Sequence, residues 1–197
     1  MRYVPAILVL VSGLCVGRLS AAEMVGVPGS KVQYPTAIEA TIGEKKIPQK
    51  LTGVAMRKKV IVDVYAIGSY IDATAKVKSG EEISAADVVK QLHLVLERNV
   101  SGKDMASAFH DAIRANYPNE FKEEMEKFLE ILRSNNVDRG DHVWLTHVPG
   151  FGIHVNLVGK KQEFVQNVKF AKAVWDIYFG PKNVGDSVKK GLASRLP

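Results

Sequence analysis

A single cation stands between two apolar stretches, and it is the residue best placed to do chemistry. Arg57 follows an apolar run over residues 51–56 and precedes another over residues 60–71. A guanidinium beside a buried sheet needs an anion, because burying its charge without a partner is costly. Arg57 therefore either faces a pocket that takes an anionic group or lies in a solvated turn with Lys58 and Lys59, which composition alone favours.

The other residues that commonly do chemistry form no comparable motif. No nucleophile elbow and no Gly-rich phosphate loop is present, which argues against a hydrolase. His147 and His154 flank one predicted hairpin and could face each other across it, but without a nearby cysteine they are expected to be ordinary strand residues. Asp138 and Asp141 flank a turn, where acids commonly bond to the backbone. We therefore expect no metal and no cofactor.

Apolar periodicity defines the elements around the cation. Residues 51–56 and 60–71 predict two strands, and the second has apolar residues on both faces, which is typical of a strand covered on two sides. Ser84 and Asp87 indicate a helix start, and the alternation over residues 92–96 then predicts a half-buried strand. A short helix would thus lead into a third strand.

Further along, the pattern becomes helical and then alternates again. Ser101 with Asp104 begins one helix, which Pro118 ends, and Asn119 begins another that ends near Asn135. Two strands and two helices complete the prediction, at residues 141–148, 153–158, 168–178 and 184–196. This order predicts an α+β fold in which a large antiparallel sheet is backed by helices on one face.

The first residues have the form of a secretory signal. Arg2 precedes an apolar run over residues 4–16, and Ser20 and Ala22 are small residues before a cut. We expect cleavage after Ala22, which leaves residues 23–197 as one domain, located in the periplasm or secreted. An uncleaved anchor is disfavoured because the apolar run is shorter than the roughly 20 residues that a bilayer needs.

Cysteine content and charge exclude further classes. Cys15 is the only cysteine, and the bulky Leu14 before it disfavours lipidation. The mature protein would then hold no disulfide. The chain has 27 basic and 21 acidic residues, and loss of Arg2 and Arg18 with the signal leaves a net charge of +4. This charge is spread along the chain, so we expect no nucleic-acid partner and, after processing, no membrane-spanning segment; the oligomeric state stays open.

Several segments together resemble the chalcone isomerase family. Residues 51–57, LTGVAMR, and 64–71, VYAIGSYI, look like a strand pair of that family, in which a Gly-containing strand ends in Arg and the next carries an AIG-x-Y pattern. Residues 94–113 look like its strand and ligand-facing helix, and residues 174–197 are similar to its closing helices. The resemblance implies an open-faced β-sandwich with a ligand cleft between sheet and helices.

Only one polar site residue of the plant isomerases is retained. These enzymes use an Arg to attract the phenolate of a chalcone, with Thr, Tyr and Asn side chains assisting, and Arg57 matches that Arg. The positions of the assisting residues fall at Tyr65, Met105, Ala112 and Ile177. The resemblance therefore implies a cleft that has become apolar except for one cation and one phenol.

These replacements favour binding over catalysis. The fatty-acid-binding members of the family clamp a carboxylate between an Arg and a Tyr, and Arg57 with Tyr65 would do the same. The residues expected to line the pocket for the tail are Met105, Phe109, Ala112 and Ile177. We expect a secreted, bacterial-type member that carries a fatty acid or similar amphipathic carboxylate and has no catalytic residue, closer to the fatty-acid-binding relatives than to the plant isomerases.

Two alternatives stay open. An isomerase would use Arg57 alone to stabilise the oxyanion of a conjugated ketone. A module that kept the fold and lost the cleft would have bulky side chains around Arg57. The stretch between Arg57 and Tyr65 is shorter than in the plant proteins, so whether the two side chains share one pocket is left to the structure.

Overall fold

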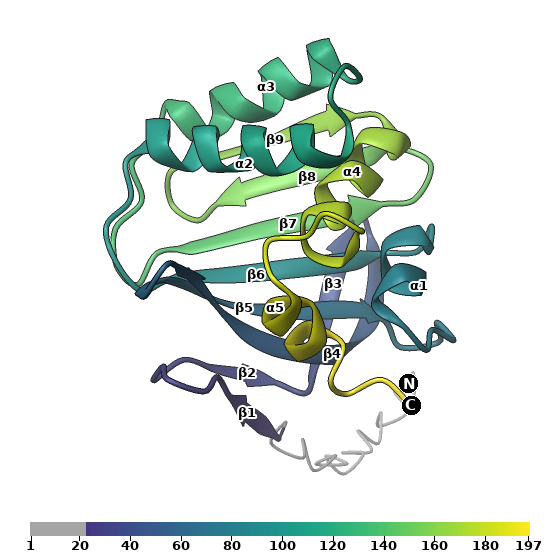
Figure 1. Cartoon of the computed structure of the whole chain (residues 1–197). Helices are drawn as coiled ribbons and strands as arrows, with labels where there is room; N and C mark the ends of the chain where they lie inside the picture. Colours follow the sequence, from purple (N-terminus) through teal and green to yellow (C-terminus); the bar gives the residue numbers. More distant parts are fainter. Residues whose placement is uncertain (1–22) are drawn as a thin grey trace, which may run out of the picture.

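The computed structural model describes residues 23–197, so the predicted signal peptide at residues 1–22 lies outside the described part of the chain. The strands are β1 (Met24–Gly26), β2 (Gln33–Pro35), β3 (Ala37–Ile42), β4 (Lys45–Lys59), β5 (Val62–Asp72), β6 (Lys90–Leu96), β7 (His142–Val148), β8 (Gly152–Leu157) and β9 (Lys161–Gln166). The helices are α1 (Gly80–Ala85), α2 (Gly102–Asn116), α3 (Lys122–Arg133), α4 (Val168–Phe179) and α5 (Asp186–Leu192). Figure 1 shows their arrangement.

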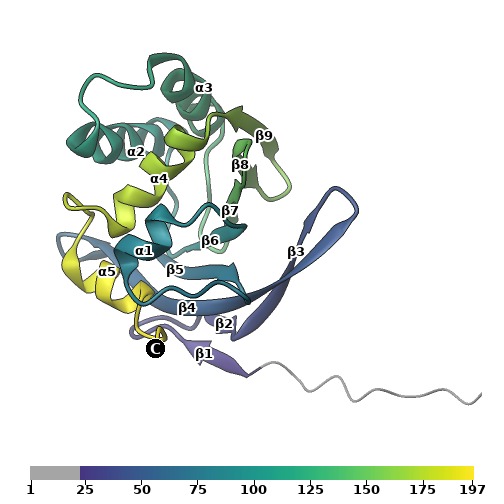
Figure 2. The ribbon, with the colours of Figure 1, turned by 90° about the vertical axis from the view of Figure 1, so that its right-hand side faces the viewer.

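The strands form a curled antiparallel sheet covered by helices on one face. Within residues 23–197, seven strands pair in the order β3-β4-β5-β6-β7-β8-β9, and β1 and β2 form a separate ribbon. The helices lie on one side of the sheet, and β3 extends away on the other (Figure 2). The expected α+β architecture of an open-faced sandwich is therefore confirmed. Among the described residues, no helix is long and apolar enough to cross a membrane.

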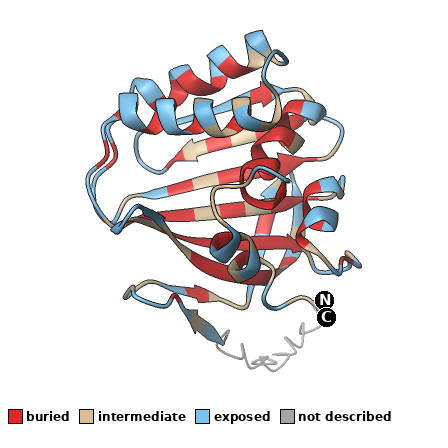
Figure 3. Cartoon of the chain, in the orientation of Figure 1, coloured by how far each residue is buried: buried red, intermediate tan, exposed pale blue. Residues whose placement is uncertain are grey.

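Strand β5 contributes to two separate cores, as the apolar residues on both of its faces predicted. Ile67 and Ile71 are buried in the large core between the sheet and the helices. Ala66 and Tyr70 are buried in a smaller core, which includes Tyr34 of the β1–β2 ribbon. In Figure 3 the buried residues accordingly form the inner sides of the helices and the middle of the sheet. The strand that follows Arg57 is thus fixed from both sides.

The sheet extends further than the apolar pattern predicted. Strand β4 is longer than the expected strand over residues 51–56, and β1, β2, β3 and β9 are absent from the prediction. In β9, for example, only Val165 is buried, so its sequence has little apolar alternation. Val60 and Ile61, expected inside a strand, instead form the two-residue turn between β4 and β5.

The predicted start of the first helix is wrong. Ser79, not Ser84, is the N-cap of α1, and its hydroxyl accepts a hydrogen bond from the backbone N–H of Glu82 at 3.2 Å. Ser79 and Glu82 have the spacing of a capping box, which is a stronger start signal than Ser84 with Asp87. Asp87 lies beyond the end of α1.

The other helix boundaries lie close to the prediction. Ser101 caps α2 as expected, since its hydroxyl accepts a hydrogen bond from the backbone N–H of Asp104 at 3.1 Å. Helix α3 begins after Phe121 rather than at Asn119, because the backbone of Phe121 is left-handed with φ 58° and interrupts the helix. Helix α5 is shorter than the predicted residues 184–196.

Two glycines between residues 51 and 72 are required by close packing on opposite faces of the sheet. A Cβ on Gly53 would lie 2.1 Å from the carbonyl oxygen of Gly191 in α5, and Gly53 has a φ of 157° that side chains rarely adopt. A Cβ on Gly68 would lie 2.7 Å from the ring of Tyr34. The glycines of LTGVAMR and AIGSY therefore let α5 and the β1–β2 ribbon contact the backbone of the sheet directly.

We expect Gly53→Ala to lower the free energy of unfolding by about 1–3 kcal/mol, the range typical of an overpacked core. The added methyl group meets backbone atoms of α5, which cannot rotate away as a side chain can. Urea-induced unfolding measures the loss. Gly26→Ala is the matched control, since a Cβ there meets nothing within 4 Å. Equal stability of the Gly53→Ala variant and the wild type would contradict this packing.

A buried lysine holds α1 against the sheet. Lys90 of β6 is fully buried, and its Nζ donates hydrogen bonds to the carbonyl oxygens of Ile83, Ser84 and Ala86 at 2.7–2.8 Å. These carbonyls end α1, where backbone acceptors have no partner inside the helix. Burial lowers the pKa of Lys90 to about 7. Lys90 therefore caps a helix and does not belong to the site described next.

Candidate functional site

A cavity of about 250 Å³ lies between the helix layer and one end of the sheet. Its lining comes from β4, the beginning of β5, the end of β6, α2 and α4, together with the loops beside them. The lining includes all six predicted site residues: Arg57, Tyr65, Met105, Phe109, Ala112 and Ile177. Residues from three separate stretches of the sequence, 57–65, 96–112 and 177–184, thus meet at one hollow.

Arg57 and Tyr65 share this cavity because of the register between β4 and β5. The two residues are directly opposite each other in the antiparallel pair, and opposite residues point to the same face of a sheet. A register shift follows Arg57, and the tight turn at Val60 and Ile61 closes the hairpin. The short stretch between Arg57 and Tyr65 is therefore a hairpin that brings them together. The alternative of a solvated turn fits Lys58 and Lys59, which are exposed, whereas Arg57 is half-buried.

Apolar side chains of two helices form the cavity wall. Met105, Phe109 and Ala112 follow the spacing of one face of α2, and Ser101 fixes where that helix begins. Ile177 contributes from α4, whose residues are mostly buried. Met105, Ala112 and Ile177 are positions where the resemblance to chalcone isomerases implied lost polar residues, and with Phe109 they give the cavity an apolar wall.

Two phenols close the inner side of the cavity beside Arg57. The hydroxyl oxygens of Tyr65 and Tyr178 lie 3.1 Å apart in a hydrogen bond. Burial raises the pKa of Tyr65, and its bond to Tyr178 and the positive charge of Arg57 oppose this rise. Burial also raises the pKa of Tyr178 well above its usual value. Both hydroxyls are therefore protonated at neutral pH, so Tyr65 can donate a hydrogen bond to an anion near Arg57.

The mouth of the cavity is positively charged. Its solvent-facing lining residues include the cations Lys59 and Arg98 and the acid Asp104. Arg57 donates a hydrogen bond to the backbone carbonyl oxygen of Lys58. In the part of the chain that the structure describes, no carboxylate lies within ion-pair distance of Arg57, Lys59 or Arg98. An anionic group entering the cavity would therefore meet cations that no protein carboxylate neutralises.

Sequence reasoning missed three of these lining residues. Lys59 belongs to a basic doublet interpreted as solvated loop charge, and Arg98 follows β6 without a motif. Tyr178 is part of an apolar helix pattern, which does not indicate its hydrogen bond. Arg98 could have been found from the strand order, because Leu96 pairs with Tyr65 and brings the end of β6 to the same edge.

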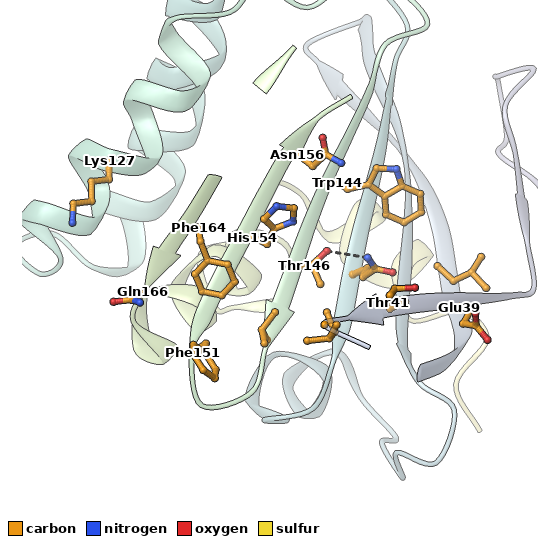
Figure 4. Close-up of a pocket in the computed structure, with 16 residues that line it drawn as sticks. Glu39, Thr41, Lys127, Trp144, Thr146, Phe151, His154, Asn156, Phe164 and Gln166 are labelled. Atoms are coloured by element: carbon orange, nitrogen blue, oxygen red, sulfur yellow. Dashed lines mark hydrogen bonds between the residues drawn. The ribbon is translucent and has the colours of Figure 1, made fainter. Parts of the chain in front are cut away.

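A second hollow lies on the opposite face of the sheet (Figure 4). This groove of about 960 Å³ runs between β3 and strands β7, β8 and β9, and Trp144, Thr146 and His154 line it. None of the six predicted site residues does. His147 and His154 do not face each other across the hairpin, because Thr146 is the residue opposite His154. His147 lies on the other face, in a hydrogen bond of 2.8 Å with Asp87.

Comparison with known proteins identifies the family. The model of the family described as chalcone isomerase-like matches residues 30–193. The chain belongs to the chalcone isomerase-like family. Among its relatives is a chalcone–flavanone isomerase from Gentiana triflora, 30% identical over 77 residues, which are 36% of this chain and 35% of the isomerase. The match thus spans about a third of that enzyme's length.

A solved structure supports the same family fold. The crystal structure of a fatty-acid binding protein from Arabidopsis thaliana superposes with a TM-score of 0.67 and 18% sequence identity, covering 88% of this chain and 95% of the plant chain. At this identity the likeness establishes the fold and not the ligand. The family and its open-faced architecture, both expected from the sequence, are therefore confirmed.

Proposed function

We propose that this protein binds a medium-chain fatty acid, or a similar amphipathic carboxylate, in the cavity between α2, α4 and the sheet, without catalysing a reaction. The observation that carries the proposal is Arg57, a half-buried cation that borders an apolar cavity and has no carboxylate partner among residues 23–197. The ligand carboxylate would supply that partner and would accept a hydrogen bond from Tyr65. The fold shared with a plant fatty-acid binding protein supports this proposal.

The carboxylate and the tail of the ligand contribute differently to the binding free energy. A charge-assisted hydrogen bond from Arg57 contributes about 1.5–3 kcal/mol, and each buried CH₂ of the tail contributes about 0.8 kcal/mol. The tail therefore dominates the affinity, and the cation sets the orientation. The cavity of about 250 Å³ is smaller than the roughly 300–1,000 Å³ of typical small-molecule pockets. This size favours a medium-chain acid over a long one.

An isomerase is the second candidate, because the chain matches part of a chalcone–flavanone isomerase and Arg57 borders the cavity. Such an enzyme would use the guanidinium to stabilise a developing oxyanion. It would also need polar groups that position the substrate and water, whereas Met105, Ala112 and Ile177 present apolar atoms to this cavity. Binding is therefore ranked first.

Calorimetric titration with decanoate and decanol, together with a chalcone turnover assay, tests the proposal. We expect decanoate to bind at least about tenfold more tightly than decanol, because only the acid pairs with Arg57. We expect chalcone to cyclise no faster than in buffer. Failure to bind decanoate would refute the carrier, and chalcone turnover that Arg57→Ala abolishes would establish the isomerase instead.

We also propose that residues 1–22 direct export, so that the protein acts in the periplasm or outside the cell. The proposal rests on the apolar run over residues 4–16 and on the small residues Ser20 and Ala22. N-terminal sequencing of the full-length gene product, expressed in a Gram-negative host and recovered from the periplasm, is expected to begin at Glu23. A product that stays in the cytoplasm and begins at Met1 would contradict export.

A further inference from the structure

The turn between β4 and β5 exposes apolar side chains to water, where they add nothing to the stability of the fold. Val60 is 91% exposed, Ile61 is 86% exposed and Val62 is 44% exposed. Scattered single apolar residues are common on surfaces, but three consecutive ones at the tip of a hairpin form a compact apolar end. We call residues 60–62 the apolar tip.

The backbone of the tip is as unusual as its exposure. Lys59 pairs with Val62, so Val60 and Ile61 form a two-residue hairpin loop, in which Asn-Gly or a similar pair is favoured. Val60 has a φ of 59°, a left-handed conformation that is strained for a β-branched residue. Both solvation and local geometry therefore disfavour these residues in the free protein, which points to a role in contact with something else.

Cations lie beside the apolar tip and at the adjoining cavity mouth. Lys58 and Lys59 precede it on β4, and Lys58 forms an ion pair of 2.8 Å with Asp63. Lys59 and Arg98, which both border the cavity mouth, have no carboxylate within ion-pair distance in the described residues. An apolar end next to Lys59, with Arg98 at the adjoining cavity mouth, is complementary to an anionic bilayer surface, where apolar groups enter the acyl region and cations stay among the phosphates.

The tip lies beside the entrance to the cavity. Arg57 and Lys59 on the strand before it, and Val64 and Tyr65 on the strand after it, all line the cavity. The hairpin is seen as the pointed end of β4 and β5 in Figure 1. A surface that holds this tip would therefore lie close to the cavity mouth.

We infer that the β4–β5 hairpin docks the protein on anionic lipid bilayers, with the apolar tip inserted and the cavity mouth facing the lipid. A ligand could then pass between the bilayer and the cavity along a short path. The docking itself needs no bound ligand, and only the direction of transfer rests on the proposed carrier function. A specific protein partner fits less well, since stable protein interfaces bury about 800 Å² on each side, and three residues at a hairpin tip offer far less.

Vesicle flotation with the processed protein tests the inference. We expect the wild type to bind vesicles of phosphatidylcholine mixed with phosphatidylglycerol, and to bind phosphatidylcholine vesicles at least about fivefold more weakly, because each basic residue near an anionic surface gains about one kilocalorie per mole. Added salt should weaken the binding to the anionic vesicles. Wild-type protein that does not float with anionic vesicles would overturn the inference.

Paired variants locate the contact. The double variant Val60→Ser with Ile61→Ser should bind the anionic vesicles at least about tenfold more weakly, the change expected for one such side chain kept in water. Phe151→Ser is the matched control, because Phe151 is 61% exposed and lines the groove on the opposite face. Equal losses in both variants, or none in the double variant, would contradict docking through this hairpin.

Titration of the same double variant with decanoate, without vesicles, separates docking from ligand binding. Neither Val60 nor Ile61 lines the cavity, so its affinity for decanoate should equal that of the wild type. If the wild type binds vesicles but no decanoate, the carrier proposal fails and docking stands. If it binds decanoate but not vesicles, docking fails and the carrier stands.

Discussion

Replacing Arg57 by alanine is expected to weaken the binding of decanoate by about 10- to 150-fold, the equivalent of one charge-assisted hydrogen bond of about 1.5–3 kcal/mol. The fold should be unaffected, since Arg57 is half-buried and its guanidinium donates a hydrogen bond to the neighbouring backbone carbonyl of Lys58. Decanol should bind the variant and the wild type equally well, because its hydroxyl carries no charge for Arg57 to pair with. Calorimetric titration of the wild type and the variant, each with decanoate and with decanol, measures how much of the affinity depends on the pairing of Arg57 with the carboxylate.

The controls for this prediction separate a local charge effect from a general one. Arg133→Ala removes an exposed arginine of α3, which pairs with Glu126 and Glu130 on the helix surface, and it should leave decanoate binding unchanged. Arg57→Lys keeps the positive charge but loses the planar guanidinium. Its affinity for decanoate should therefore lie between those of the Arg57→Ala variant and the wild type. If Arg57→Ala binds decanoate as the wild type does, the cation has no role in recognition.

The second large effect is expected from filling the cavity. Ala112→Phe places a ring in a space of about 250 Å³ and should reduce decanoate binding by more than about 100-fold, because excluding four methylene groups costs about 3 kcal/mol. Melting temperature reports whether the variant folds. Asp111→Phe on the same helix is the matched control, since Asp111 has a side chain that is 75% exposed, and it should bind decanoate normally.

A graded series keeps this prediction testable even if the phenylalanine disturbs packing. Ala112→Val and Ala112→Leu add smaller groups, so the longest acid that still binds well should shorten step by step. Titration with acids from hexanoate to tetradecanoate measures this limit. The same preferred length in all variants would show that Ala112 does not face the tail, and the proposed cavity would then be the wrong site.

The parts of the fold that were predicted well from the sequence are those with a regular pattern of apolar residues. The apolar pattern on both sides of β5 required two cores, and two cores are present, with Ile67 in one and Ala66 in the other. The stripe of α2 placed Met105 and Phe109 on one face, which is the face that lines the cavity. Periodicity works here because burial on a regular element repeats with the geometry of that element.

The elements that were missed carry little of this signal. Strands β3 and β9 each have only one buried residue, and their pairing with neighbours depends on backbone hydrogen bonds that every sequence offers. Val60 and Ile61 look like strand residues because they are β-branched and apolar, although the register makes them a turn. No local pattern could have indicated this, since the position of a turn depends on the pairing of both strands.

The candidate site could be predicted only in part for a related reason. Arg57 stands out because it interrupts an apolar sequence, and family resemblance singled out Tyr65. Arg98 and Tyr178 reach the cavity through the pairing of β6 with β5 and through the packing of α4. The groove on the opposite face of the sheet (Figure 4) lies between β3 and strands β7, β8 and β9. About half the chain separates β3 from these three strands in the sequence. Contacts between residues so far apart in the sequence can be identified only once the strand order of the sheet is known.

The most direct test of the carboxylate-binding cavity is a crystal structure of the protein with 10-bromodecanoate, in which anomalous scattering locates the bromine. We expect one bromine peak against Met105 and Phe109, with the carboxylate within hydrogen-bond distance of the Arg57 guanidinium and the Tyr65 hydroxyl. A peak in the groove of the opposite face, or a ligand whose carboxylate points away from Arg57, would contradict it.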